Sequence, residues 1–346
     1  MKNVFNKIKK NVQSKSIGIK PALQNSDHLV FLDDNLTIMQ YLPQESIRCI
    51  YFDPPFFTKK TRVIDSRRAQ NSTPRYSDNW KSLELYLEWL RIRIVEAKRL
   101  LTKDGVIFIH CDWHASHYIK IIMDDVFGYK NFKNEIIWQR STTIGRSSKN
   151  NFKKLDTISD SIFLYSKNIN LCLKKVFRNH FIPFNGSNPP SGYYYDDKKG
   201  EYFKTSPLGN YSKDSIEMFY KQGRIYLTRN GKERLKYFVE VTKKNGTLYI
   251  CEHRELGNIW NDIHSMMHSC SKNKISYPTQ KPTLLLKRIF SMCTSAGDIV
   301  ADFFNGSGTS LIAAKELNLY YLGSDINPEG IAITSKRLEA NSKQAA

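Results

Sequence analysis

Two short loop motifs, each directly after an apolar run, lie at opposite ends of this 346-residue chain. Residues 48–52 (Arg-Cys-Ile-Tyr-Phe) lead into 53–56 (Asp-Pro-Pro-Phe), and residues 299–301 (Ile-Val-Ala) lead into 302–309 (Asp-Phe-Phe-Asn-Gly-Ser-Gly-Thr). Such runs are typical of buried parallel strands, whose carboxyl ends carry the ligand sites of open α/β sheets. We therefore predict an α/β fold with a mostly parallel sheet, in which these two strands are central neighbours and build one site.

The pattern between the motifs divides the chain into four segments. Residues 1–25 are basic and are expected to form a flexible arm, whereas residues 26–167 alternate apolar runs with a clear amphipathic helix at 81–103. From 168 to 265 this alternation stops and Tyr, Gly, Asn and Lys dominate, which predicts a separate, irregular or β-rich insertion. The alternation returns within 266–346, so we expect two halves of one α/β domain to flank the insertion.

The chain carries a formal net charge of +20, from 53 basic and 33 acidic residues. Such an excess favours a polyanionic partner, although a lysine-rich proteome would give the same composition without one. Two stretches rich in Lys and Arg, 58–78 and 139–154, are predicted to contact nucleic-acid phosphates; the alternative is a solvated surface. The basic residues singled out in them are Lys59, Lys60, Arg62, Arg67, Arg68, Arg140, Arg146 and Lys149.

The composition also indicates the compartment. No apolar stretch approaches the roughly 20 residues that span a bilayer, and no apolar core follows the lysine-rich N-terminus. The six cysteines are scattered without a C-x-x-C pair, as in a reducing compartment. We therefore expect a cytoplasmic protein without a membrane partner.

Cys111, His114 and His117 have metal-like spacing, but no second ligand pair lies nearby, so no metal is expected.

The C-terminal motif has the order of a nucleotide site: strand, Asp302, Gly306-Ser307-Gly308, helix. Glycines allow close approach of a ligand to the backbone, and Asp325, at the end of the next apolar run, is spaced like an acid that binds ribose hydroxyls. The alternative is a tight strand-to-helix turn. No third glycine or G-K-[ST] sequence follows, which argues against a dinucleotide or a gripped phosphate. The remaining candidate is a nucleoside without phosphate, S-adenosylmethionine.

The N-terminal motif suits methyl transfer to an exocyclic amine. The lone pair of such an amine is delocalised into the ring, and two acceptors on its hydrogens would free it for attack. Asp53 supplies one acceptor and the Pro54 carbonyl the other, while Pro54 and Pro55 stiffen the loop. Phe56 offers a flat face for an extruded base. The alternative is a simple turn that ends a strand.

Three motifs together resemble a known family. Residues 53–56, 277–282 (Tyr-Pro-Thr-Gln-Lys-Pro) and 302–309 are similar to those of the β-class DNA adenine-N6 methyltransferases, above all the modification subunits of type III restriction systems and their solitary relatives. The similarity covers about 28–338 and matches the insertion poorly, as expected for a target-recognition domain. It implies a Rossmann-like, S-adenosylmethionine-dependent methyltransferase fold with the motifs in circularly permuted order.

The resemblance also implies roles for individual residues. It assigns the target base to Asp53, Pro54, Pro55 and Phe56. It assigns the cofactor to Asp34, Thr279, Gln280, Lys281, Asp302, Phe304, Gly306, Ser307, Gly308, Thr309 and Asp325, with Thr279, Gln280 and Lys281 at its methionine end. The chain departs from the family pattern at Phe303, where a proline is usual, at Tyr277, where a histidine is usual, and at Asp33, where a glycine is usual.

These observations predict a site-specific DNA methyltransferase that acts on adenine N6 in duplex DNA with base flipping, in a bacterial restriction-modification or epigenetic system. One alternative is cytosine-N4 methylation, against which Asp rather than Ser at position 53 argues. The other is a non-catalytic DNA-binding relative, against which the intact motifs argue. The expected partner is double-stranded DNA in the nucleoid, and the resemblance also allows a homodimer and a restriction subunit.

Overall fold

The computed structural model describes residues 1–13, 20–58, 61–63, 74–142, 155–186, 188–266 and 280–344. They fall into two compact units, one formed by Met1–Val176 with Gly257–Ala346 and the other by Phe177–Leu256. Among the helices of these ranges, none is both long enough and apolar enough to cross a membrane.

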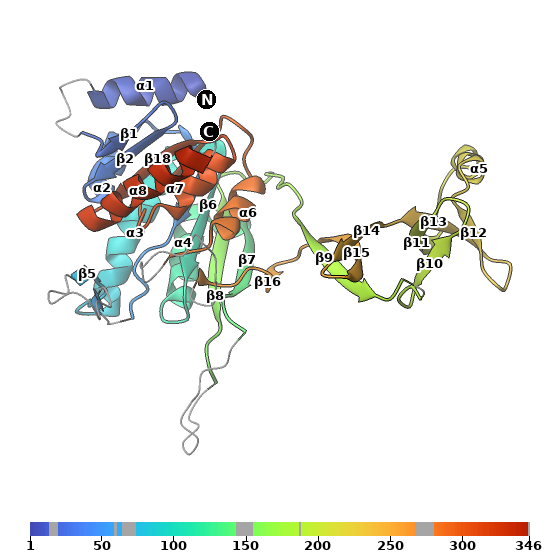
Figure 1. The fold of residues 1–346 in the computed structure, drawn as a ribbon. Helices are drawn as coiled ribbons and strands as arrows, with labels where there is room; N and C mark the ends of the chain where they lie inside the picture. The colour runs from blue at the N-terminus through green and yellow to red at the C-terminus, as the bar shows by residue number, and fades with distance from the viewer. Residues whose placement is uncertain are drawn as a thin grey trace, which may run out of the picture. The chain divides into compact units, whose positions relative to one another are not determined.

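The larger unit is built around a nine-stranded sheet with the order β1-β2-β18-β17-β3-β6-β8-β7-β16 (Figure 1). Its strands are β1 (Leu23–Gln24), β2 (His28–Leu32), β3 (Ile47–Phe52), β6 (Leu101–Cys111), β7 (Phe132–Gln139), β8 (Ser159–Ser166), β16 (Ile259–Trp260), β17 (Ile299–Asp302) and β18 (Tyr320–Asp325). The run from β2 to β6 is parallel throughout, as is the pair β7 and β16. β17 lies directly beside β3, with Val300 opposite Cys49. The predicted α/β fold with neighbouring motif strands is therefore confirmed.

Alternation along the strands explains the layer of helices on each face of this sheet. In β3, Ile50 and Phe52 join one hydrophobic cluster with residues of α1 to α4, whereas Cys49 and Tyr51 join a second cluster with residues of α6 to α8. Successive side chains point to opposite faces of a strand, so a strand covered on both faces is apolar throughout. The helices are α1 (Lys2–Gln13), α2 (Asn35–Tyr41), α3 (Leu83–Leu100), α4 (Ser116–Phe127), α6 (Thr283–Ser291), α7 (Thr309–Glu316) and α8 (Pro328–Gln344).

The expectation of a flexible arm at 1–25 is wrong for helix α1, which packs on the larger unit. Phe5 is 0% exposed, and its ring stacks on that of Tyr320 with 4.7 Å between centroids. Ile8 is also buried in the cluster shared with α2 to α4. Burial of two large apolar side chains stabilises the helix by roughly 3 to 6 kcal/mol, which outweighs the mutual repulsion of its exposed lysines.

Helix α3 supplies one wall of the site described below, and its sequence explains its limits. Ser82 caps its first turn through the Leu85 amide, and Leu90 and Ile94 pack into the core. The helix ends at Leu100 rather than at the predicted residue 103, because Leu101 already continues as the first residue of β6. A buried arginine, Arg93, interrupts the apolar stripe with 4% exposure.

The smaller unit is rich in strands and lies within the predicted insertion, 168–265. Two antiparallel sheets, β10-β11-β13-β12 and β14-β15-β9, make up most of it. Its elements are β9 (Phe177–Phe184), β10 (Tyr193–Asp196), β11 (Glu201–Pro207), α5 (Lys213–Lys221), β12 (Ile225–Leu227), β13 (Glu233–Phe238), β14 (Glu240–Lys244) and β15 (Thr247–Glu255). The function of this unit in target recognition stays a prediction.

Candidate active site

Four adjacent parallel strands end at one edge of the sheet, and an aspartate stands at or just after the end of each. Asp34 follows β2, Asp325 ends β18, Asp302 ends β17 and Asp53 follows β3. A single cavity collects all four of these side chains. The structure thus brings residues separated by almost 300 positions to the edge where open α/β sheets bind ligands. The predicted site residues in the lining are Asp34, Asp53, Pro54, Pro55, Phe56, Lys281, Asp302, Phe304, Gly306, Ser307, Thr309 and Asp325.

The glycine-rich loop that follows β17 is tightly fixed. The Gly306 amide donates to Asp325 Oδ2 at 2.6 Å. Gly308 has a φ of 73° and precedes the first residue of α7, and a Cβ at this position would lie 2.6 Å from Thr334 of α8. Glycine is therefore required at position 308 by both the backbone conformation and the packing of α8. Gly308 packs against Thr334 and does not line the cavity, so its contribution to the site is to the conformation of the loop.

A buried network of polar side chains holds the same loop from below. The Asp302 carboxylate accepts hydrogen bonds from Ser310 Oγ and from the Phe304 amide. Ser310 also contacts the Tyr321 hydroxyl, which donates to Asn305 Oδ1 at 2.7 Å. Burial raises the pKa of Asp302 to about 7, because the charged form loses its hydration. Sequence reasoning placed Asp302 at the site, and its side chain lines the cavity, but it assigned no role to Tyr321 or Asn305 in holding the loop.

The loop 53–56 is held by groups that sequence reasoning missed. The Tyr86 hydroxyl of α3 donates to the Pro55 carbonyl at 2.7 Å. The buried Asp78 carboxylate accepts from the amides of Phe57 and Thr58 at 3.0 and 2.7 Å. Phe57 has a φ of 60°, a conformation that a non-glycine residue adopts only when its surroundings hold it there. The loop is therefore prepared for binding rather than loose.

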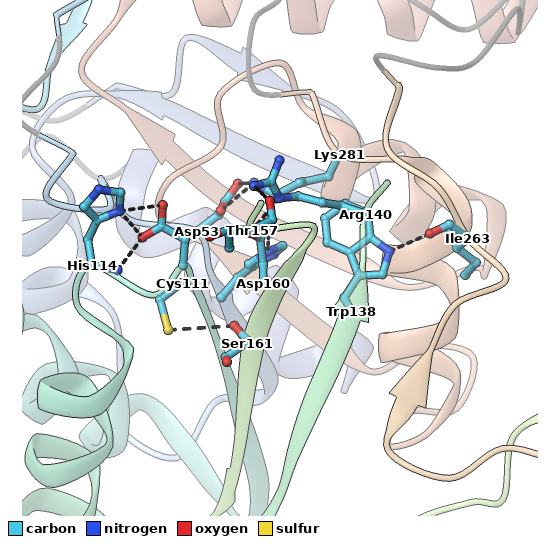
Figure 2. Close-up of polar contacts among 12 residues, drawn as sticks. Asp53, Cys111, His114, Trp138, Arg140, Thr157, Asp160, Ser161, Ile263 and Lys281 are labelled. Atoms are coloured by element: carbon cyan, nitrogen blue, oxygen red, sulfur yellow. Dashed lines mark hydrogen bonds and ion pairs between the residues drawn. The ribbon is translucent and has the colours of Figure 1, made fainter. Parts of the chain in front are cut away.

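Lys281 contacts the Asp53 carboxylate, whereas the resemblance predicts that it contacts the cofactor. Its ammonium donates to both oxygens of Asp53, at 2.7 Å to Oδ1 and 2.5 Å to Oδ2 (Figure 2). The two side chains are 11% and 17% exposed. The same ammonium lies 5.2 Å from the ring centroid of Phe56. The ammonium group of Lys281 is therefore already paired with the carboxylate of Asp53 in this structure. Gln280 is buried and lies outside the cavity lining.

Helix α3 adds an arginine that fixes the acid at the end of β2. Arg93 Nη2 donates to Asp34 Oδ2 at 2.7 Å, and Arg93 Nε donates to Asn35 Oδ1 at 2.6 Å. Asn35 in turn donates to the Phe303 carbonyl at 2.9 Å, which ties α2 to the glycine-rich loop. The guanidinium also covers the ring of Trp89, 4.1 Å from its centroid. An arginine at a core-facing position of an amphipathic helix was the available sequence signal for this network.

The predicted phosphate contacts are described only in part. Arg140 is described, and its Nε pairs with Asp160 Oδ1 at 2.9 Å, so part of its charge is already neutralised within the protein. Arg62 lies in β4 (Thr61–Val63), which pairs with β5 (Pro74–Ser77). The remaining predicted residues lie outside the described ranges, as does one predicted cofactor residue; they are Lys59, Lys60, Arg67, Arg68, Arg146, Lys149 and Thr279.

The charges of the cavity restrict what it can bind. Among the described residues of its lining, six are aspartates and one, Lys281, is basic; the aspartates are Asp33, Asp34, Asp53, Asp78, Asp302 and Asp325. Such a lining repels phosphate groups but suits a ligand with positive charges and free hydroxyls. The rings of Trp89 and Phe304, whose centroids are 5.8 Å apart and whose planes are inclined at 58°, add an apolar surface. The residues present therefore fit a cationic nucleoside such as S-adenosylmethionine.

Comparison with known proteins identifies relatives along most of the chain. A probable type III restriction-modification enzyme HindVI Mod subunit of Haemophilus influenzae is 26% identical over 86% of this chain and 48% of its own length. The type II methyltransferase M.EcaI of Enterobacter cloacae is 24% identical over 92% of this chain and 71% of its own length. The chain thus spans about half the length of the type III relative.

The fold is shared with a solved structure, and a family profile matches the sequence. The PvuII DNA methyltransferase, described as cytosine-N4-specific, superimposes with a TM-score of 0.55 and 15% identity over 92% of this chain and 88% of that one. At this identity the likeness concerns the fold alone. The profile of the DNA methylase family matches residues 47–336, which include both motif loops. This protein therefore belongs to the DNA methylase family.

Proposed function

We propose that this protein transfers a methyl group from S-adenosylmethionine to adenine N6 in duplex DNA. One observation carries the proposal: the loop at 53–56 and the glycine-rich loop follow adjacent parallel strands and face one cavity. An acceptor loop for an amine and a loop for a nucleoside are thereby placed within reach of each other. Membership in the DNA methylase family supports the same reaction.

The cofactor would be held by the glycine-rich side of the cavity. Asp325 offers its carboxylate to ribose hydroxyls, while Phe304 and Trp89 offer rings to the adenine. Asp34, held by Arg93, supplies negative charge for the cationic part of the ligand. When bound, S-adenosylmethionine supplies a methyl group already activated by a sulfonium charge. No metal is required for such a transfer.

The target base would be held by the opposite side. Asp53 and the Pro54 carbonyl accept the two amine hydrogens and so free the nitrogen lone pair for attack. Lys281 fixes the orientation of the Asp53 carboxylate, and the Phe56 ring stacks on the base. A base paired within a duplex cannot enter such a cavity, so the reaction requires base flipping. Asp53 first receives the proton that the amine loses.

The choice of adenine rests on Asp at position 53, where the resemblance associates Ser with cytosine-N4 enzymes. Duplex DNA would be bound by the basic stretches 58–78 and 139–154, and the unit 177–256 would read the sequence. The name of the type III relative implies a restriction subunit as a further partner. Co-purification with the product of an adjacent gene would test that partner.

Transfer of a tritiated methyl group into unmethylated plasmid DNA tests the proposal. Asp53→Ala should lower the turnover at least 100-fold, because the aimed acceptor is lost, while calorimetry should show nearly unchanged cofactor binding. Asp125→Ala is the matched control, since Asp125 is a surface residue paired with Arg91 at 2.6 Å. Turnover by Asp53→Ala at the level of Asp125→Ala would reject the mechanism.

A further inference from the structure

A hydrogen-bonded series of buried side chains crosses the sheet next to the loop 53–56. The Tyr51 hydroxyl of β3 contacts His110 Nδ1 of β6 at 2.8 Å, and His110 Nε2 contacts Asp160 Oδ2 of β8 at 3.2 Å. Arg140, directly after β7, is the last member of the series, and its Nε donates to Asp160 Oδ1 (Figure 2). The four strands are consecutive neighbours in the sheet. We refer to Tyr51, His110 and Asp160 as the buried relay.

The three polar side chains of the buried relay lose their hydration on folding, which lowers the stability of the protein. His110 is 0% exposed, and Tyr51 and Asp160 are almost as inaccessible. Polar groups at such positions must be fully hydrogen-bonded, and apolar side chains of the same volume would stabilise the sheet at least as well. The methyl transfer described above uses none of the three. Their arrangement therefore calls for a function of its own.

The direction of the hydrogen bonds follows from Asp160. Burial by itself raises the pKa of Asp160, but the hydrogen bond from His110 and the charge of Arg140 outweigh it and hold the pKa below the usual value. The carboxylate can then only accept, so His110 Nε2 carries a hydrogen. In a neutral ring Nδ1 must accept the Tyr51 hydroxyl hydrogen. Only the lone pairs of the Tyr51 oxygen then remain available to a ligand.

The buried relay lies next to both ends of the motif loop. Tyr51 stands two residues before Asp53 on β3 and lines the same cavity. The ring of His110 lies 5.7 Å from that of Phe56 and 5.4 Å from that of Trp138, measured between centroids. A rotation of His110 would therefore disturb the Tyr51 hydroxyl and the face behind Phe56 together.

We propose that the buried relay is a set of positioning residues for methyl transfer, an inference that rests on the proposed function. His110, locked by Asp160, fixes the Tyr51 hydroxyl as an acceptor in the wall of the cavity. The same ring supports Phe56, so that the base meets a rigid surface. Small errors in such alignment lower a transfer rate strongly without preventing binding.

Two variants and their combination test the transfer step. Tyr51→Phe removes one hydroxyl and leaves the Arg140 pair intact. Asp160→Asn weakens the lock on His110, because the Asn amide can donate to Nε2 as well as accept from it. Each should lower the single-turnover rate by about 10-fold or more, with the KM for DNA changed less than about 3-fold. The double variant should be no slower than the slower single variant, because residues that act as a unit are not additive.

Tyr165→Phe is the matched control for these variants. Tyr165 is a buried tyrosine of β8 whose hydroxyl donates to Asp124 at 2.5 Å, outside the cavity lining. Loss of the Tyr165 hydroxyl should lower the thermal stability as much as loss of the Tyr51 hydroxyl does, but it should leave the transfer rate unchanged. A purely structural function of the buried relay would make Tyr51→Phe and Tyr165→Phe equal in both measurements, which would overturn the proposal.

A second readout does not depend on activity. Nitrogen NMR of ¹⁵N-histidine protein should show His110 as the Nε2–H tautomer with an accepting Nδ1, a signal assigned by its loss in His110→Gln. Asp160→Asn should mix the tautomers. The opposite tautomer in the wild-type protein would refute the buried relay whether or not the enzyme transfers methyl groups. Wild-type protein with the expected tautomer but no transfer would instead refute the proposed function.

Discussion

Replacement of Lys281 by methionine separates the function suggested by the structure from the one suggested by the resemblance. The substitution keeps the length of the side chain and removes two charge-assisted hydrogen bonds to Asp53, at 2.5 and 2.7 Å. A hydrogen bond to a charged group contributes about 1.5 to 3 kcal/mol when it is shielded from water. If about 2 kcal/mol of this orients Asp53 in the transition state, the loss lowers kcat about 30-fold.

The assay is methyl transfer at saturating S-adenosylmethionine, together with calorimetric measurement of cofactor binding. Lys281→Met should lower kcat about 30-fold and leave the cofactor Kd within about 3-fold, since the ammonium lies on Asp53. Lys287→Met is the control from the adjacent helix α6, because Lys287 forms an exposed pair with Glu316 that contributes less than about 1 kcal/mol. A cofactor Kd raised 10-fold with kcat unchanged at saturation would refute the reasoning and would show that Lys281 binds the cofactor.

Three further predictions concern stability and DNA binding. Because burial raises the pKa of Asp302 to about 7, the folded protein keeps a proton that the unfolded chain releases above about pH 4, so the free energy of unfolding should fall as pH rises from about 4 to 7. Asp302→Asn should remove up to about 4 kcal/mol of this decline in denaturant titrations without cofactor, and an unchanged pH profile would contradict the assignment. Gly308→Ala forces a side chain into a left-handed conformation and against Thr334, which should cost at least about 1 to 2 kcal/mol and lower the Tm; a Tm equal to the wild type would contradict this packing. Arg67→Ala combined with Arg68→Ala should weaken DNA binding and reduce its log-log salt slope by about 0.9 for each lost phosphate contact, whereas an unchanged slope would exclude these residues from the interface.

The sheet and the position of the site could be predicted from sequence because they depend on local patterns. Apolar runs before Asp53 and Asp302 identify strands buried on both faces, and the carboxyl ends of parallel strands meet at one edge. Asp325 entered the prediction through its place at the end of the next apolar run and its spacing from Asp302. Each of these inferences uses information contained within a few tens of residues.

The contacts that complete the site could not be predicted, because they join distant segments through the packing of whole elements. Lys281 and Asp53 are 228 positions apart, and Arg93 and Asp34 are 59 positions apart. Their pairing depends on how α3 lies against α2 and on the course of the chain before α6. The same is true of His110 and Asp160, whose contact follows from the antiparallel register of β6 and β8. No periodicity in the sequence encodes those relations.

Helix α1 shows a different kind of error. Its apolar residues Val4, Phe5, Ile8 and Val12 recur at helical spacing, but the surrounding lysines gave the segment the composition of a disordered arm. Composition indicates disorder only when too little apolar surface is available for burial. Here four apolar side chains on one face suffice, because the larger unit offers the matching surface around Tyr320.

Mass spectrometry of nucleosides tests the central claim most directly. Unmethylated duplex DNA is incubated with the protein and S-adenosylmethionine that carries a deuterated methyl group, then digested to nucleosides. We expect deuterium-labelled N6-methyladenine with the wild-type protein and none with Asp53→Ala. Labelled N4-methylcytosine would contradict the choice of base, and the absence of any labelled nucleoside would contradict the assignment of the cavity to methyl transfer.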